Sequence, residues 1–133
     1  MTTRDSLLQD ADLIHVYTRA QALTDGVLVD ISRLATEAGF RYPVAVTAAV
    51  WHLLTPFDDL ARLGQSTTGR AWDLLQVLRT AIRHCRHTDR VHFTPLFVLD
   101  ALHPTPQAVR LWAVCGPGDD EAPVITVMCE GED

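Results

Sequence analysis

The sequence of 133 residues contains neither lysine nor asparagine, and all of its eleven basic residues are arginines. Without lysine the chain cannot form a Schiff base or carry a phosphate-loop lysine, so enzyme classes that need either are excluded. Without asparagine it has no N-glycosylation acceptor and no asparagine amide for an oxyanion. Alanine, arginine, valine and leucine are abundant, so a compositional bias explains both absences as well as a function does.

Long apolar runs are also lacking, because no stretch approaches the roughly 18–20 residues that span a membrane. The N-terminus, MTTRDSLLQDADL, carries charges where a secretory signal needs apolar residues, which predicts a cytoplasmic protein. Cys85, Cys115 and Cys129 are widely spaced and form no CxxC pair. We therefore expect reduced, mostly buried thiols and no disulfide framework.

The chain is acidic, with a net charge of −6 when histidine is neutral. Contacts with phosphates dominate non-specific affinity for nucleic acid, so direct nucleic-acid binding is not expected. A local patch of Arg79, Arg83, Arg86 and Arg90 is the place where an exception would lie. The length fits a single domain over 1–133, in which residues 1–11 can form a loose N-terminal arm.

The N-terminal part shows the pattern of short strands and helices. Residues 13–17 alternate and are rich in β-branched and aromatic side chains, which predicts a first strand. Three elements follow: a helical turn at 19–23 capped by Thr18, an extended segment at 27–30 after the Asp25-Gly26 turn, and a helix at 33–38 between a Ser32 cap and Gly39.

The apolar stretch 44–54 has a mixed pattern. Its β-branched residues favour a strand, whereas its alanines and its length favour a helix. We expect a buried helix that begins after Pro43. A polar connection over 56–68 follows, with a helical turn at 57–63.

One amphipathic helix is predicted over 70–85. Trp72, Leu75, Leu78 and Ile82 recur at helical spacing, and Leu74 and Val77 widen this apolar stripe. The period then changes, and 90–99, 108–115 and 124–129 form three β-like segments with turn-rich separations. Short separations imply antiparallel neighbours. The expected packed face of this three-stranded meander consists of Phe93, Phe97, Leu111, Ala113, Ile125 and Val127.

These elements predict an α+β fold: a small mixed domain with an N-terminal strand and helix part, one long amphipathic helix and a C-terminal three-stranded antiparallel meander. No internal repeat or linker indicates a second domain.

The histidines near the end of the amphipathic helix are the densest group of potential metal ligands. His84 and His87 are spaced so that both side chains can reach one ion, and His92 is close in sequence. The favoured interpretation is a helix C-terminus, where histidine and arginine interact well with the carbonyl end of the dipole. No metal or other cofactor is therefore expected.

Two groups are candidates for partner binding. Phe40, Arg41 and Tyr42 place two aromatic rings and an arginine before a helix start, a composition typical of interface hot spots. The alternative is a hydrophobic staple that fixes the entry of the helix. Asp119, Asp120 and Glu121 either form a solvated turn or present a negative surface to an arginine-rich partner.

Three stretches carry a family resemblance: 12–30, 38–47, and Gly116-Pro117-Gly118-Asp119 with Pro123-Val124-Ile125-Thr126. They resemble the DUF6573 family of small uncharacterised proteins carried by bacterial plasmids, phages and other mobile elements. The resemblance covers about residue 12 to 133 and carries over no functional residue. It implies an accessory protein of a mobile element that acts by binding, such as an inhibitor of host defence, for example an anti-CRISPR or antirestriction protein.

A second likeness belongs to another class. The predicted strand with His15 and Tyr17, followed by Gly26-Val27-Leu28, is similar to the opening of ADP-ribosyltransferase-type folds. It implies that His15 holds the nicotinamide ribose of NAD and that Glu130 polarises it. The simpler interpretation is that His15 and Tyr17 share one face of an ordinary strand.

The favoured function is protein binding, with a host or element-encoded protein as partner and no membrane attachment. A two-fold homodimer stays open as an alternative, as do an NAD-using enzyme and a small metal-binding domain.

Overall fold

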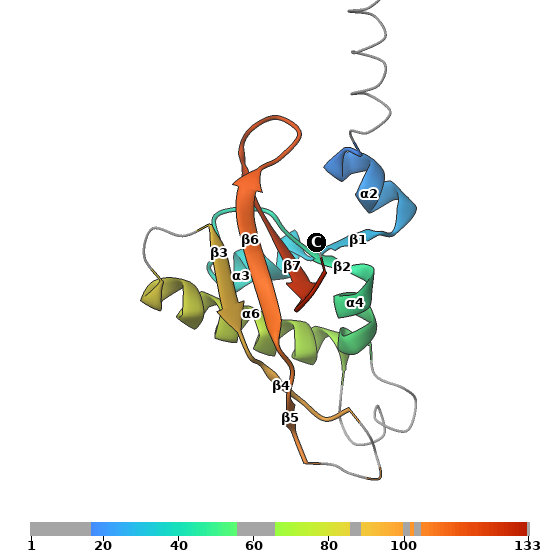
Figure 1. The fold of residues 1–133 in the computed structure, drawn as a ribbon, viewed down its shortest axis with the longest axis vertical. Coiled ribbons are helices and arrows are strands. Elements are labelled where there is room, and N and C mark those ends of the chain that lie inside the picture. The colour runs from blue at the N-terminus through green and yellow to red at the C-terminus, as the bar shows by residue number, and fades with distance from the viewer. Residues whose placement is uncertain (1–16, 56–65, 86–88, 100–101, 103–104, 133) are drawn as a thin grey trace, which may run out of the picture.

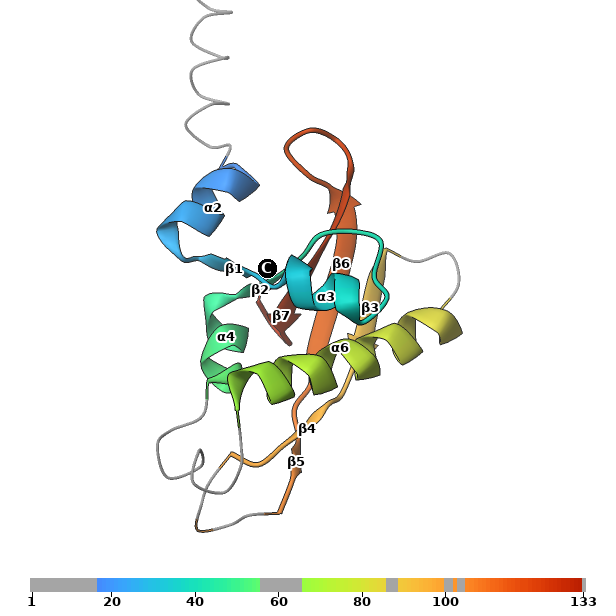
Figure 2. The same ribbon diagram turned by 180° about the vertical axis from the view of Figure 1, so that it is seen from behind.

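The computed structural model describes residues 17–55, 66–85, 89–99, 102 and 105–132. Within these ranges a five-stranded sheet is covered on one face by helices (Figures 1 and 2). The elements are α2 (Arg19–Asp25), β1 (Leu28–Asp30), α3 (Ser32–Glu37), β2 (Val44–Thr47), α4 (Ala48–Leu54), α6 (Thr67–His84), β3 (Arg90–Phe93), β4 (Leu96–Phe97), β5 (Gln107–Ala108), β6 (Leu111–Pro117) and β7 (Pro123–Cys129).

The sheet has the strand order β1-β2-β7-β6-β3, and β4 pairs separately with β5. β3, β6 and β7 form the predicted antiparallel meander, in which Ala113 lies between Val91 and Val127. The N-terminal pair β1 and β2 joins this meander through a parallel contact of β2 with β7. The α+β class is therefore confirmed, and the sheet is wider than the sequence predicted.

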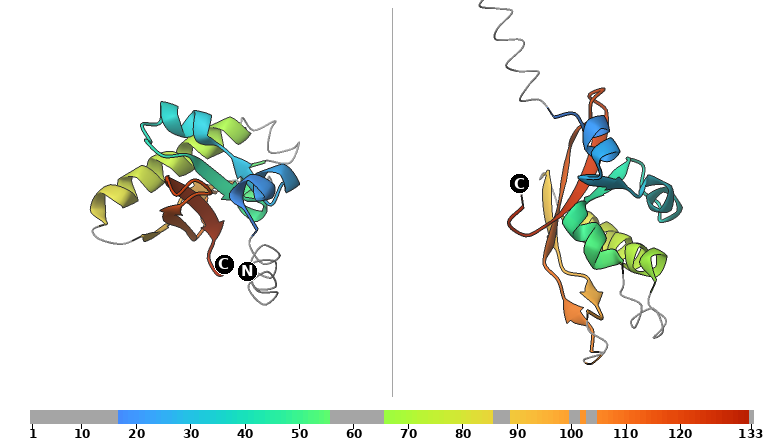
Figure 3. Two further views of the ribbon diagram at one scale, coloured as in Figure 1. Left: turned by 90° about the horizontal axis from the view of Figure 1, so that it is seen from above. Right: turned by 90° about the vertical axis from the view of Figure 1, so that its right-hand side faces the viewer.

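The core lies between the sheet and α3, α4 and α6, which share one side of it in Figure 3. Alternation along each strand sends every second side chain into this core. All six residues expected on the packed face belong to it: Phe93, Phe97, Leu111, Ala113, Ile125 and Val127. We call this face the inner face and the opposite one the outer face.

Helix α6 confirms the predicted amphipathic helix, although it begins earlier, at Thr67, because the Ser66 hydroxyl accepts a hydrogen bond from the backbone N–H of Gly69 at 3.0 Å. Its buried side agrees with the expected stripe in part. Leu74, Leu75 and Leu78 are fully buried, together with Ala71, whereas Trp72, Val77 and Ile82 are exposed.

The prediction of a single helix over 44–54 is wrong. Val44, Ala45 and Val46 form β2 and are fully buried, because this strand lies between β1 and β7 and has both faces covered. The chain passes from strand to helix at Thr47, which is both the last residue of β2 and the N-cap of α4. Its hydroxyl accepts a hydrogen bond from the backbone N–H of Val50 at 3.3 Å.

The segment 90–99 is likewise two strands. Pro95 interrupts it, since proline has no N–H to donate to a ladder, and β4 leaves the main sheet to pair with β5.

The helix predicted at 33–38 is α3. Ser32, the predicted cap, is the first residue of this helix, and Ile31 is at the cap position.

The N-terminal helix matches its prediction. Thr18 and Gln21 form a reciprocal capping box at the start of α2, and Gly26 ends the helix at a φ of 78°. Of the predicted strand at 13–17, all but Tyr17 lies outside the described residues, as does the helical turn at 57–63.

None of the helices in the described ranges is both long and apolar enough to cross a membrane.

A substitution at Leu75 tests which side of α6 is buried in the core. Leu75→Ala should lower the free energy of unfolding by about 2–5 kcal/mol, because it leaves a cavity beneath a fully buried side chain. Val77→Ala on the same helix, where the side chain is 37% exposed, should cost at most about 1 kcal/mol. Urea unfolding of both variants measures the difference, and equal losses would contradict the assigned buried side.

Candidate functional site

Two hollows lie on opposite faces of β6 and β7. The first, of about 380 Å³, opens at the inner face beyond the edge of the core and is lined by Ala113, Cys115 and Ile125. The second, of about 700 Å³, lies on the outer face and is lined by Val114, Gly116 and Thr126. Neighbouring residues of one strand point to opposite faces, so the same two strands supply both hollows.

The first hollow, which we call the arginine pocket, lies between the α3–β2 loop, the C-terminal half of α6 and the sheet. Its floor is apolar and comes from Val91, Ala113 and Ile125. Its walls carry arginines and the aromatic residues of the loop. The wall residues are Phe40, Arg41, Tyr42, Arg79, Ile82 and Arg83.

The structure therefore brings the predicted group Phe40, Arg41 and Tyr42 to a pocket. Phe40 is half-buried and packs against the core, whereas Arg41 and Tyr42 are exposed, Tyr42 by 45%. The Phe40 ring thus anchors the loop, but not as the predicted helix staple, because strand β2 follows at Val44. The other two side chains are available to a partner.

The guanidinium groups of this pocket are not engaged by other described side chains or backbone groups of the protein. Among the described residues, no hydrogen bond or ion pair engages Arg41, Arg79 or Arg83, and Asp89 is the one acidic side chain that lines the pocket. Arg79 lies over the backbone of Gly39, where an added Cβ would be 3.1 Å from its Cζ. The pocket thus combines an apolar floor with a cationic rim.

The expected arginine patch is divided by the fold. Arg79 and Arg83 reach the arginine pocket, but Arg90 lies on the outer face with its guanidinium 4.3 Å from the ring centre of Trp112. Arg86 is outside the described residues.

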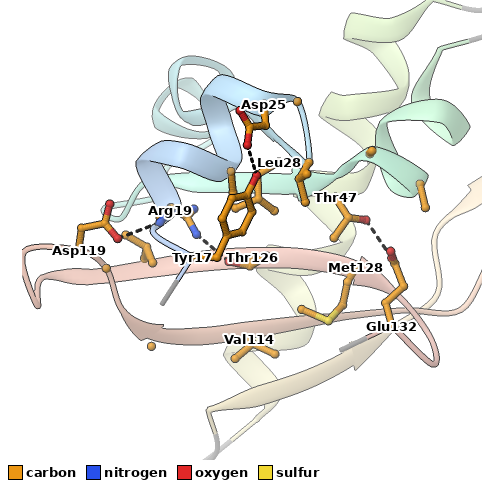
Figure 4. A pocket seen from close by; sticks show the side chains of 18 of the residues that line it. Tyr17, Arg19, Asp25, Leu28, Thr47, Val114, Asp119, Thr126, Met128 and Glu132 are labelled. Atoms are coloured by element: carbon orange, nitrogen blue, oxygen red, sulfur yellow. Dashed lines mark hydrogen bonds between the residues drawn. The ribbon is translucent and has the colours of Figure 1, made fainter. Parts of the chain in front are cut away.

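The second hollow, which we call the outer cleft, lies between α2 and the outer face of β6 and β7 (Figure 4). Asp119 holds the start of α2, because its two carboxylate oxygens accept from the N–H groups of Arg19 and Ala20, each at 2.9 Å. Both hydrogen bonds lower the pKa of Asp119 below its usual value, and the bond from Ala20 contributes more than the bond from Arg19.

Arg19 makes the second attachment of α2. Its guanidinium donates to the Thr126 hydroxyl at 2.7 Å and to the carbonyl of Ile125 at 3.0 Å. Burial lowers the pKa of Arg19, although an arginine stays charged at any physiological pH. Each of its two terminal nitrogens therefore has one acceptor on β7.

Two further pairs frame the outer cleft. The Tyr17 hydroxyl donates to Asp25 Oδ2, and this bond is the main reason why the pKa of Tyr17 is raised. The Thr47 hydroxyl donates to Glu132 Oε2 at 2.9 Å, and the same oxygen accepts from the N–H of Cys129. Nothing in the sequence spacing indicated that Asp25, Thr47 and Glu132 would line one cleft.

The predicted acidic group has divided roles. Asp119 holds α2, Asp120 accepts from the N–H of Ala122 at 3.2 Å, and Glu121 is exposed with a φ of 68°. None of the three lines the arginine pocket, so the two predicted partner-binding groups are not brought together.

The histidines are also placed apart. The Nδ1 of His84 lies 2.8 Å from the carbonyl of Thr80, while His92 packs its ring edge-on against Trp112 on the outer face. His87 lies outside the described residues. Within the part of the chain that the structure describes, no three His, Cys, Asp or Glu side chains are grouped to hold a metal.

The residues of the NAD-based alternative are not gathered either. Tyr17 lines the outer cleft, His15 is outside the described residues, and Glu130 lies away from the cleft lining, 3.9 Å from Arg110 in an exposed ion pair. Burial raises the pKa of Cys129, which keeps this thiol protonated and disfavours it as a nucleophile.

Comparison with known proteins gives one match. The model of DUF6573, described as a family of unknown function, matches residues 5–133. No curated protein and no solved structure matches the chain.

Asp119 should make the attachment of α2 sensitive to acid. Its pKa is depressed in the folded state, so its contribution is complete above the unfolded pKa of about 3.9 and is lost as pH falls through the lower folded value. Asp119→Ala should therefore lower the melting temperature at pH 7 and lose this effect in strong acid. Asp73→Ala, on the exposed side of α6, is the control, and a pH-independent difference would contradict the assignment.

Gly39 should be required for the shape of the arginine pocket. Its φ of 99° disfavours any side chain, and a Cβ would displace the guanidinium of Arg79. Gly39→Ala should cost about 1–3 kcal/mol in urea unfolding. Gly116→Ala, where a Cβ meets nothing within 4 Å, should be nearly neutral, and the reverse order would show that the loop adopts another conformation.

Proposed function

Since this chain belongs to the DUF6573 family, whose function is unknown, we propose from its own geometry that it is a protein-binding module that uses the arginine pocket. The observation that carries this proposal is the set of three guanidinium groups, on Arg41, Arg79 and Arg83, that surround an apolar floor without internal partners among the described residues.

The chemistry of the pocket selects the partner. Guanidinium groups bind carboxylates through paired, charge-assisted hydrogen bonds, and the apolar floor accommodates an aliphatic or aromatic side chain. The partner is therefore a protein that presents an apolar residue flanked by aspartate or glutamate. Exposed Tyr42 beside these arginines has the composition of an interface hot spot.

The same proposal extends to the biological target. We place the protein in the cytoplasm, as an accessory product of a mobile element that captures a component of a host defence or nucleic-acid-processing complex. The origin is what the resemblance of the sequence implies. The acidic balance of the chain supports a protein target, because it disfavours direct capture of nucleic acid.

The first experiment is a tagged pull-down from a bacterial lysate at moderate salt, read by quantitative mass spectrometry. The Arg79→Ala, Arg83→Ala double variant is the test bait, and Arg33→Ala, an exposed arginine of α3 outside the pocket, is the matched control. One protein should be recovered near equimolar ratio with the wild type and the control and lost with the double variant. Equal recovery by all three baits would contradict the proposal.

With the purified partner, Arg79→Ala and Tyr42→Ala should each weaken binding by about tenfold, which corresponds to about 1.4 kcal/mol. Rising salt should also weaken binding, because the arginine rim is exposed and screened. Isothermal titration calorimetry with wild type, the two variants and Arg33→Ala measures both effects. Affinity that is independent of salt and of Arg79 would show that another surface binds.

A further inference from the structure

The outer cleft differs from the arginine pocket in the charge of its lining, which carries Asp25, Asp119 and Glu132. We propose that it binds a small amphipathic organic cation, an apolar body that carries an ammonium or guanidinium group. Its volume of about 700 Å³ lies within the range of ligand pockets for small molecules. It faces away from the arginine pocket and does not depend on the function proposed for that pocket.

The body of the ligand is selected by the lining. Val114, Val124 and Met128 provide an apolar floor on the outer face of the sheet, and Ala22 and Leu28 provide apolar walls. Such a lining stabilises an aromatic or aliphatic group by removing it from water.

The charge of the ligand is selected by the carboxylates of the lining. Tyr17 donates to Oδ2 of Asp25, while Glu132 accepts from the Thr47 hydroxyl, from the N–H of Cys129 and from the Cys129 thiol. Among the described residues, no hydrogen bond engages Oδ1 of Asp25. Asp25 at the end of α2 and Glu132 after β7 therefore place two negative charges beside the cleft, as Figure 4 shows for their side chains.

Anionic ligands are disfavoured by the charge of the lining. Among the described residues, Arg19 is the one arginine that lines the cleft, against the three carboxylates of Asp25, Asp119 and Glu132. The charge of Arg19 offsets one of these carboxylates, so a phosphate or carboxylate would meet a lining that is negative overall. A cationic head on an apolar body complements both the apolar floor and this net charge.

Three probes that share a phenylethyl body and differ in the charge of the head group test the proposal: 2-phenylethylamine, 2-phenylethanol and 3-phenylpropionate. In a millimolar titration followed by two-dimensional NMR, the amine should bind at least tenfold tighter than the alcohol, and the anion should bind weakest. Shifted resonances should belong to cleft residues such as Leu28 and Thr126. Equal affinity of amine and alcohol, preference for the anion, or no shift with any probe would overturn the proposal.

Variants distinguish the contribution of the carboxylate charges to binding from the contribution of the cavity. Asp25→Asn and Glu132→Gln keep an oxygen acceptor for the internal hydrogen bonds. Each should weaken the affinity for the amine by about tenfold and leave the affinity for the alcohol unchanged. Gly116→Leu should abolish binding of both probes, because its side chain extends into open space in the cleft without a clash at Cβ. Asp73→Asn on α6 is the control and should change nothing. An amine affinity that survives Gly116→Leu in folded protein would place the site elsewhere.

Discussion

The parallel pairing of β2 with β7 is the contact on which the rest of the fold depends. β7 pairs with β6 on one side, close in sequence, and with β2 on the other, where Val46 lies beside Val127. β2 and β7 lie far apart in the sequence, so their pairing closes a long loop of the chain. Loop closure costs conformational entropy, which the burial of both strands must offset. Val44, Val46 and Val127 are fully buried, so the contact that joins the two halves of the chain is also the centre of the core.

The same strand determines where binding can occur. Ile125 points to the inner face and lines the arginine pocket, while its neighbour Thr126 points to the outer face and accepts from Arg19. Because neighbouring residues of a strand face opposite ways, one short segment supports two surfaces that cannot touch the same ligand. A partner in the arginine pocket and a cation in the outer cleft would both stabilise β7, and so each would favour the folded state that the other binds.

The elements that the sequence predicted are those that depend on neighbours in the chain. The amphipathic helix α6, the capping residues of α2 and the turn between β6 and β7 arise from local patterns, and the structure confirms them, although Trp72 and Ile82 of the α6 pattern are exposed. Strand β2 was missed although its β-branched residues favoured a strand, because the pairing with β1 and β7 that decides between strand and helix depends on residues distant in the chain. Phe40, Arg41 and Tyr42 were identified by residue type, whereas their pocket with Arg79 and Arg83 follows from the packing of α3 against α6.

Two of the eleven arginines have structural roles that suit a guanidinium better than an ammonium. Arg19 donates from one terminal nitrogen to the Thr126 hydroxyl and from the other to the carbonyl of Ile125. Arg70, only 4% exposed, likewise divides its two terminal nitrogens between the carbonyls of Leu53 and Val98, which ties α4 and the segment after β4 to α6. A planar guanidinium holds two such donors in a fixed fork and is more weakly hydrated than an ammonium. At these two positions lysine would place one compact, strongly hydrated charge where two separated acceptors must be reached, so arginine is required by the packing itself.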